Sequence, residues 1–125
     1  MVIESLFYED VQKFLDDNGI RYIPNVSFLG KSKLPTNYDF AIAGSNKVPE
    51  RLIKVVNRMN TDQARNIIFS WNDTKDGRRE DTKLYAFIQD SEEKVSKDAL
   101  EALKQYDIHP TLWSERNAVL GELVA

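Results

Sequence analysis

The sequence contains no cysteine and a single histidine, His109, so several classes of site are excluded at once. Without cysteine there are no disulfides, no thiolate zinc sites and no thiol nucleophiles, and one histidine cannot form a multi-histidine metal site. Chemistry on this chain must therefore use carboxylates, lysine, arginine, tyrosine or hydroxyl groups.

Long apolar runs and a strong net charge are also missing. No apolar stretch approaches the roughly 20 residues that a helix needs to cross a bilayer. The N-terminal MVIESLFYEDV has neither the basic start nor the small-residue cleavage site of a secretory signal, which predicts a cytoplasmic protein. The net charge of -3 and the pI of about 5.2 do not give the strongly positive field of a dedicated nucleic-acid-binding protein.

Length and hydrophobic periodicity predict one α/β domain spanning residues 1–125. Apolar residues at helical spacing predict helices over residues 4–18, from 60 through 71, over 96–106 and over 117–125. The first helix should bury Leu6, Phe7, Val11, Phe14 and Leu15, and Asn60 and Ser96 should cap the second and third.

Strand patterns fall at residues 20–29, 38–43, 51–57, 83–89 and 108–113. Pro24 places the first strand at an edge, and KLYAFIQ indicates a central strand that is covered on both faces. The order of elements is α, β, β, β, α, β, α, β, α, which predicts a three-layer α/β/α domain with a mixed sheet. Residues 72–82 are polar throughout and predict an exposed loop.

Two charges stand in the middle of otherwise apolar strands. Asp39 lies in YDFAIA and Lys54 lies in RLIKVVN. Strand alternation puts Asp39 on a face with Ala41 and Ala43, opposite Tyr38, Phe40 and Ile42. Because an unpaired buried charge costs several kcal/mol, Asp39 and Lys54 should either neutralise each other or serve a site.

The core order αβββαβ, followed here by αβα, resembles that of the restriction-endonuclease-like superfamily. These nucleases use the pattern PD, a gap, then (D/E)xK, in which two acidic residues hold a divalent metal and the lysine assists the attacking water. By this resemblance Asp39 is the acid of the second strand, and Lys54 is the lysine of the third. The acid expected two residues before the lysine is replaced by Leu52.

A substitute acid could come from several places. Glu50 lies four residues before Lys54, and Glu9, Asp10 and Gln63 on the flanking helices are further candidates. The resemblance then implies Asp39 and Glu50 as ligands of Mg²⁺ or Mn²⁺, since these ions prefer carboxylate oxygens. The alternative is a salt bridge between Asp39 and Lys54 on a degenerate scaffold.

Basic residues crowd the middle of the chain and could contact nucleic acid or a partner, although acidic residues lie among them. The proposed contact residues are Lys31, Lys33, Arg58, Arg65, Arg78 and Arg79. The GKS of residues 30–32 lacks the context of a phosphate-binding loop, because Asn25 stands where the motif needs glycine and no helix follows.

A second resemblance runs from Val26 nearly to the C-terminus. The segments FLGKS, YDFAI, PERLIKVVN, IIFSWNDTK, KLYAFIQDSE and LWSER resemble an uncharacterised bacterial and phage domain, which is usually the C-terminal half of a longer protein. This resemblance implies a bacterial or mobile-element origin and no assigned activity. It makes a partner-binding role plausible.

Two hypotheses follow. The first is a non-enzymatic module, phage-encoded or from a mobile element, that binds a protein partner or nucleic acid on a nuclease-like scaffold, for example as an inhibitor of a host defence system. It would need no cofactor. The alternative is a nuclease cleaving DNA or RNA, with Asp39, Lys54 and Glu50 at the site and Mg²⁺ or Mn²⁺ bound. Leu52 and the acidic pI favour the first; the sequence indicates no membrane association and leaves the oligomeric state open.

Overall fold

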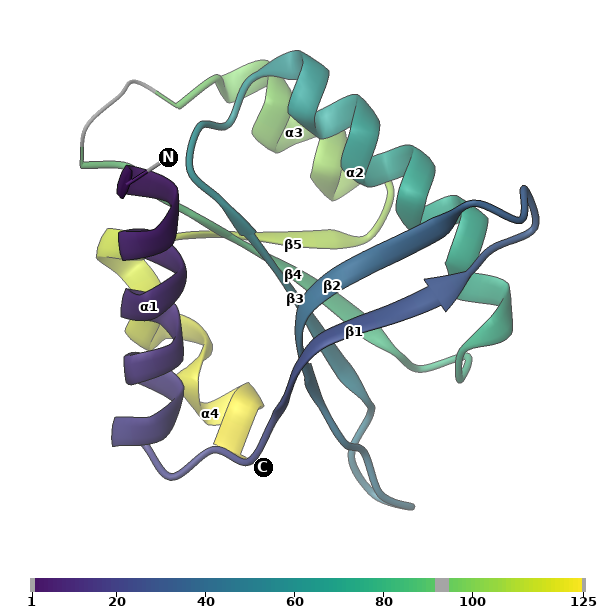
Figure 1. The fold of residues 1–125 in the computed structure, drawn as a ribbon, viewed down its shortest axis with the longest axis horizontal. Coiled ribbons are helices and arrows are strands. Elements are labelled where there is room, and N and C mark those ends of the chain that lie inside the picture. The colour runs from purple at the N-terminus through teal and green to yellow at the C-terminus, as the bar shows by residue number, and fades with distance from the viewer. Residues whose placement is uncertain (1, 92–94, 125) are drawn as a thin grey trace.

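In the computed structural model, which describes residues 2–91 and 95–124, a five-stranded mixed sheet lies between two layers of helices (Figure 1). This is the predicted three-layer α/β/α arrangement, and residue 125 of the predicted last helix lies outside the described residues. The elements are α1 (Val2–Asp17), β1 (Ile23–Leu29), β2 (Pro35–Ile42), β3 (Arg51–Val56), α2 (Thr61–Thr74), the 3₁₀ turn η1 (Lys75–Gly77), β4 (Lys83–Ile88), α3 (Lys97–Gln105), β5 (Ile108–Leu112), the 3₁₀ segment η2 (Trp113–Val119) and α4 (Leu120–Val124).

The strands lie in the order β1-β2-β3-β4-β5. The first three form an antiparallel meander, and β3, β4 and β5 run parallel to one another. β1 is an edge strand, as Pro24 predicts. β4 is covered on both faces, and every side chain from Leu84 to Ile88 is fully buried, which agrees with its continuous apolar pattern.

One helical layer is formed by α1 and the C-terminal segment (Figure 1). Phe7, Val11, Phe14 and Leu15 are buried against the sheet, as the helical periodicity predicts. Leu6 was expected in the same stripe but is 54% exposed. At 100° per residue Leu6 lies well outside the arc that the four buried residues cover.

The other layer is formed by α2 and α3, whose apolar faces pack on the opposite side of the sheet. Asn60 caps α2 by accepting a hydrogen bond from the Gln63 backbone N–H at 2.8 Å, and Ser96 caps α3 through the Ala99 N–H at 3.1 Å. Both caps were predicted. Within the described residues, no helix combines the length and apolar character that membrane crossing requires.

β2 departs from regular alternation at Asp39. Tyr38 packs with α2 and α3, whereas Phe40 packs with α1, although a regular strand would put both on one face. The expectation that these two residues share a face is therefore wrong. Asn25, on the neighbouring strand, has a positive φ of 53°, and the pairing of β2 with β3 ends at Phe40. The outer part of the hairpin consequently bends toward α2 (Figure 1).

The hairpin tip is fixed to the C-terminal end of α2 by Asp73. Its carboxylate accepts hydrogen bonds from the Ser32 N–H at 2.8 Å and from the Ser32 hydroxyl at 2.7 Å, and its carbonyl accepts from the Lys31 N–H at 3.0 Å. A Cβ on Gly30 would overlap this carboxylate. The prediction of an exposed loop from residue 72 is wrong here, because α2 continues to Thr74 and Asp73 is only 9% exposed.

The C-terminal helix is held by two buried side chains from the sheet. Arg51, which is 2% exposed, donates hydrogen bonds to the Glu122 carbonyl at 2.8 Å and to the Ala43 carbonyl at 2.9 Å. The Tyr85 hydroxyl donates to the Glu122 carboxylate at 2.5 Å. Burial, together with this carboxylate, raises the pKa of Tyr85 above its ordinary value of 10.0, so the phenol is protonated at neutral pH.

Candidate functional site

Asp39 and Lys54 lie where β2 and β3 part, and each bonds to a backbone group of the other strand. The Asp39 carboxylate accepts a hydrogen bond from the Val55 N–H at 2.7 Å. The Lys54 ammonium donates to the Asn37 carbonyl at 2.9 Å. Both backbone groups have lost their partners in the ladder between the strands, so the two side chains replace hydrogen bonds of the sheet.

Asp39 and Lys54 are close enough to affect each other without forming a direct ion pair among the described residues. Burial raises the pKa of the Asp39 carboxyl, while the hydrogen bond from Val55 and the charge of Lys54 act to lower it. The structure thus gives a third outcome beside a catalytic pair and a salt bridge. Each charge is held mainly by a backbone group.

A cavity of about 650 Å³ opens beside Asp39, between the sheet and the helices α1 and α2. On β3 and just after it, Val55 and Asn57 lie on the side of this cavity. The buried Oδ1 of Asn57 has no hydrogen-bond partner in the described chain. The cavity is lined by Tyr8, Glu9, Asp39, Val55, Val56, Asn57, Arg58 and Gln63.

Lys54 borders a different cavity, of about 150 Å³, on the α2 side of the sheet. Gln63 borders both cavities. Lys54 and Val55 are consecutive residues, so their side chains leave β3 on opposite faces. The larger cavity extends past the end of β3, where Val56 and Asn57 also line it.

The structure does not bring Glu50 and Asp39 together. Glu50 precedes β3, whereas Asp39 bonds to Val55 near the other end of that strand. The Glu50 carboxylate accepts two hydrogen bonds from Arg78, at 3.0 and 2.5 Å, and one from the Thr82 hydroxyl at 3.3 Å. The expected metal pair of Asp39 and Glu50 is therefore not formed, because Glu50 is committed to a bidentate ion pair.

Of the other proposed substitutes, Glu9 and Gln63 line the Asp39 cavity, and Asp10 does not. Both residues are exposed on α1, and the two differ in that Glu9 borders the cavity. Glu9 and Asp39 are thus the two carboxylates of this cavity. Among the described residues no group of three or more histidine, cysteine or carboxylate side chains is arranged to hold a metal ion.

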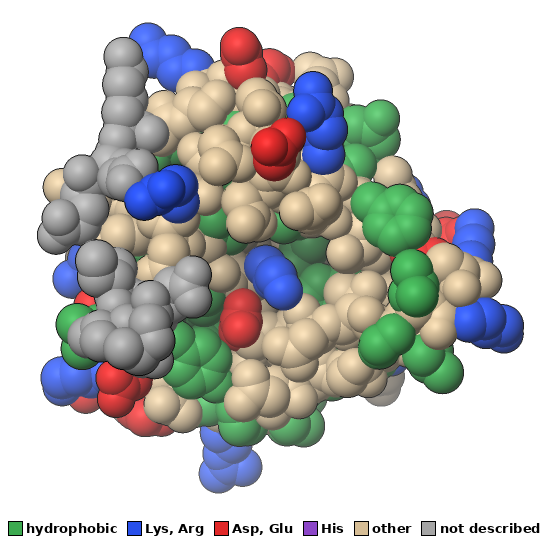
Figure 2. Space-filling view, turned by 45° about the horizontal axis from the view of Figure 1, so that its top comes forward, with side chains coloured by type: hydrophobic (Ala, Val, Ile, Leu, Met, Phe, Trp, Pro, Cys, Tyr) green, Lys and Arg blue, Asp and Glu red, His purple; other side chains and the backbone are tan. Residues whose placement is uncertain are grey.

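The basic residues expected to bind nucleic acid or a partner do not form one surface. Figure 2 shows Lys and Arg side chains scattered over one face, with acidic side chains between them. Four of the six have carboxylate partners, in the pairs Lys31–Asp76, Arg65–Asp62, Arg78–Glu50 and Arg79–Asp81.

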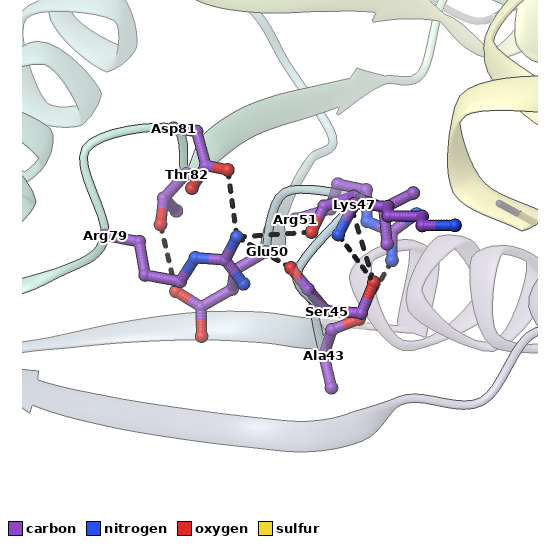
Figure 3. A network of polar contacts seen from close by, with 9 residues as sticks. Ala43, Ser45, Lys47, Glu50, Arg51, Arg79, Asp81 and Thr82 are labelled. Atoms are coloured by element: carbon purple, nitrogen blue, oxygen red, sulfur yellow. Dashed lines mark hydrogen bonds and ion pairs between the residues drawn. The ribbon is translucent and has the colours of Figure 1, made fainter.

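Arg79 also has a structural role in the β2–β3 connection (Figure 3). Its guanidinium donates to the carbonyls of Ser45 and Val48, at 2.9 and 3.3 Å. Of the two remaining basic residues, Lys33 occupies a left-handed position in the hairpin tip, with φ of 70°, and Arg58 borders the Asp39 cavity.

Asp73, near the C-terminal end of α2, holds the hairpin tip, and sequence reasoning missed it. The GKS segment does surround an anion with donors, but the anion is the protein's own carboxylate. The available signal was the helical spacing of Ile67, Trp71 and Thr74, which carries α2 past residue 71 and places Asp73 inside the helix.

The fold is an α/β domain with a mixed five-stranded sheet, and the candidate site is a cavity with charged side chains at the point where two strands separate. A family model described as "Domain of unknown function DUF1829" matches residues 30–116. The chain belongs to this family, in agreement with the predicted membership of an uncharacterised domain. No curated protein is similar enough to match.

A crystal structure of protein VC1899 from Vibrio cholerae has a similar fold. The TM-score is 0.61 at 14% sequence identity, and the match covers 96% of this chain and 33% of VC1899. The present chain thus spans about a third of the length of that protein. At this identity the likeness shows the fold alone.

Proposed function

We propose that this domain is a non-catalytic binding module on a nuclease-like scaffold and that its partner is a protein. The proposal rests on the side chains with which β3 and the residue after it line the Asp39 cavity. A nuclease of the resembled type has an acid and a lysine there, whereas this chain has Val55 and Asn57. Neither side chain supplies a metal ligand of high charge or an ammonium group.

The charges around the cavity favour a protein over nucleic acid. Glu9 and Asp39 place two carboxylates in the cavity, and Arg58 is its one cationic side chain. Carboxylates repel a phosphate backbone and attract the lysine or arginine side chains of a protein. Four of the six basic residues expected at such a surface, Lys31, Arg65, Arg78 and Arg79, are paired with carboxylates, which reduces the positive charge that they offer to phosphate groups.

The proposal includes the finer expectations from the sequence. The module is encoded by a phage or another mobile element and acts in the cytoplasm, where a protein without cysteine loses nothing to the reducing conditions. An inhibitor of a host defence protein is a role of this kind, because it requires a specific surface and no chemistry.

The test is affinity capture from lysates of bacteria and of phage-infected bacteria, using wild type, Glu9→Lys and Asp10→Lys. Glu9 lines the cavity, and Asp10 is the exposed neighbour on the same helix, so the second variant controls for the change in charge. Wild type and Asp10→Lys should capture the same protein, and Glu9→Lys should lose it. Equal capture by Glu9→Lys, or recovery of nucleic acid alone, would refute the proposal.

A metal-dependent nuclease is the second candidate, and one observation favours it. Glu9 borders the same cavity as Asp39, so α1 offers a second carboxylate where β3 has none. These two residues would hold Mg²⁺ or Mn²⁺, which would offset charge on a phosphodiester. A nicking assay on DNA and RNA should then show cleavage by wild type and by Glu50→Gln, but none by Asp39→Asn or Glu9→Gln. Cleavage that survives both cavity changes would exclude this candidate.

A further inference from the structure

The smaller cavity beside Lys54 lies between the outer part of β2, the end of β3 and the middle of α2. Its volume is about 150 Å³, below the range of roughly 300–1,000 Å³ typical of pockets for whole small molecules. It is lined by Thr36, Tyr38, Lys54, Gln63, Asn66, Ile67 and Ser70. Only a small chemical group fits such a space.

Four polar side chains in this cavity have hydrogen-bonding capacity that the described protein does not use. Thr36 is only 9% exposed, and its hydroxyl has no hydrogen-bond partner within residues 2–91 and 95–124. The Ser70 hydroxyl and the side-chain amides of Gln63 and Asn66 also have no partner in the described chain, and Gln63 and Asn66 are exposed residues at the mouth of the cavity. Water or a ligand can reach the Thr36 hydroxyl from the cavity, because it is not one of the fully buried polar atoms that lack a partner among the described residues.

Lys54 adds the positive charge. Its ammonium uses one donor on the Asn37 carbonyl, and an ammonium group has three. The tyrosine in the cavity is not available, because Tyr38 already shares a hydrogen bond of 2.7 Å with the Thr74 hydroxyl. The free groups are thus one ammonium, two hydroxyls and two amides, all of which can donate.

A small oxyanion fits this set of donors. Lysine, serine, threonine, asparagine and glutamine are the side chains that contact phosphate oxygens in proteins. No carboxylate lines this cavity, in contrast to the neighbouring one, and Asp39 is bound to the Val55 N–H on the other face. We propose that the cavity binds a phosphate group, either as the free ion or as the terminal group of a small phosphate ester.

This proposal does not depend on the protein partner, because Lys54, Thr36 and Ser70 line the smaller cavity and not the larger one. Gln63 is the one residue that lines both. Both cavities adjoin the place where β2 and β3 separate. One has the carboxylates of Asp39 and Glu9 in its lining, and the other has the ammonium of Lys54 and no carboxylate.

The test is a two-dimensional NMR titration of the full chain with sodium phosphate, at an ionic strength held constant with chloride. Saturable shifts should appear at Thr36, Lys54 and Ser70. Lys54→Met and Thr36→Val should each weaken binding by about tenfold or more, which is the loss of one charge-assisted or buried hydrogen bond. Arg65→Met is the matched control, because Arg65 lies on α2 outside the cavity, and its affinity should equal that of wild type.

A second titration with adenosine monophosphate distinguishes the two sources. Binding of both compounds supports a site for the terminal group of an ester, and binding of phosphate alone supports a site for the free ion. Unsaturable shifts spread over lysines and arginines would mean an adventitious ion only and would overturn the proposal. Unchanged affinity in both cavity variants, with folding checked by circular dichroism, would do the same.

Discussion

The role of Asp39 can be decided by replacing it with asparagine and with alanine. Asparagine keeps an oxygen that can accept the Val55 N–H but removes the charge, whereas alanine removes both. Loss of the acceptor leaves a half-buried N–H without a partner, which costs about 1–3 kcal/mol. Relief of the buried carboxylate offsets part of this cost, so we expect Asp39→Ala to lose about 1–2 kcal/mol of unfolding free energy.

Asp39→Asn should keep or raise the unfolding free energy at neutral pH, because the hydrogen bond survives and no charge remains to be desolvated. Urea denaturation measures both values. A loss of 1 kcal/mol also lowers the melting temperature of a domain of this size by about 3–6 °C. Asp10→Ala, on an exposed position of α1, is the matched control and should equal wild type.

The pH dependence gives an independent check. Because burial raises the pKa of the Asp39 carboxyl above 3.8, the folded protein holds this proton more tightly than the unfolded chain. The contribution of the Asp39 carboxyl to the unfolding free energy is therefore fully present below the pKa that it has in the unfolded chain. It is lost as the pH rises through the pKa that it has in the folded protein. Relative to Asp39→Asn, wild type should therefore become less stable as the pH rises above the ordinary pKa of 3.8.

Two results would refute the structural role of Asp39. An asparagine variant as unstable as the alanine variant would mean that the charge, and not the acceptor, holds the strands. An alanine variant as stable as wild type would mean that the bond to Val55 contributes nothing. The second result is expected of a residue kept for ligand binding at a cost in stability.

Three further changes test the fold around the site. Gly30→Ala should lower the unfolding free energy, measured by urea denaturation, by about 1–3 kcal/mol, because a Cβ would overlap Asp73. Gly77→Ala is the control and should be neutral, because a Cβ there meets nothing within 4 Å. Equal effects of the two changes would contradict the packing around Gly30. Arg51→Met should lower the unfolding free energy by about 2–4 kcal/mol and speed the exchange of backbone amide hydrogens in α4. Unchanged exchange rates in α4 would show that the guanidinium does not hold the helix. Tyr85→Phe should lower the unfolding free energy by about 1 kcal/mol. The difference from wild type should be constant from about pH 6 to 9 and should shrink only above pH 10.0, because the raised pKa of Tyr85 keeps the phenol protonated below that value. A difference that varies near neutral pH would contradict this.

Much of the fold follows from local pattern. The stripe of α1, the caps Asn60 and Ser96, and the apolar run of β4 each specify their element through interactions within a few residues. The order of elements then limits the arrangement to a mixed sheet with helices on both faces. Asp39 and Lys54 could be singled out as well, because charges within apolar strands are rare.

What the two charges do depended on long-range geometry. Strand alternation assumes a regular ladder, but β2 leaves β3 at Phe40 and turns at Asp39 to follow the hairpin that Asp73 fixes to α2. The role of Glu50 likewise depends on a distant residue, because its ion-pair partner Arg78 lies 28 positions further along the chain.

The sequence by itself determined the helices, the strands, the layer architecture and the two charges at its centre, because these depend on periodicity and capping within a few residues. Only the tertiary structure decided where the ladder between β2 and β3 ends. At that point the Asp39 carboxylate accepts the Val55 N–H and the Lys54 ammonium donates to the Asn37 carbonyl, and two cavities adjoin it, one lined by Asp39 and Glu9 and the other by Lys54. The physical reason is that backbone groups must find partners wherever two strands separate, and which side chains reach them is set by packing between distant segments.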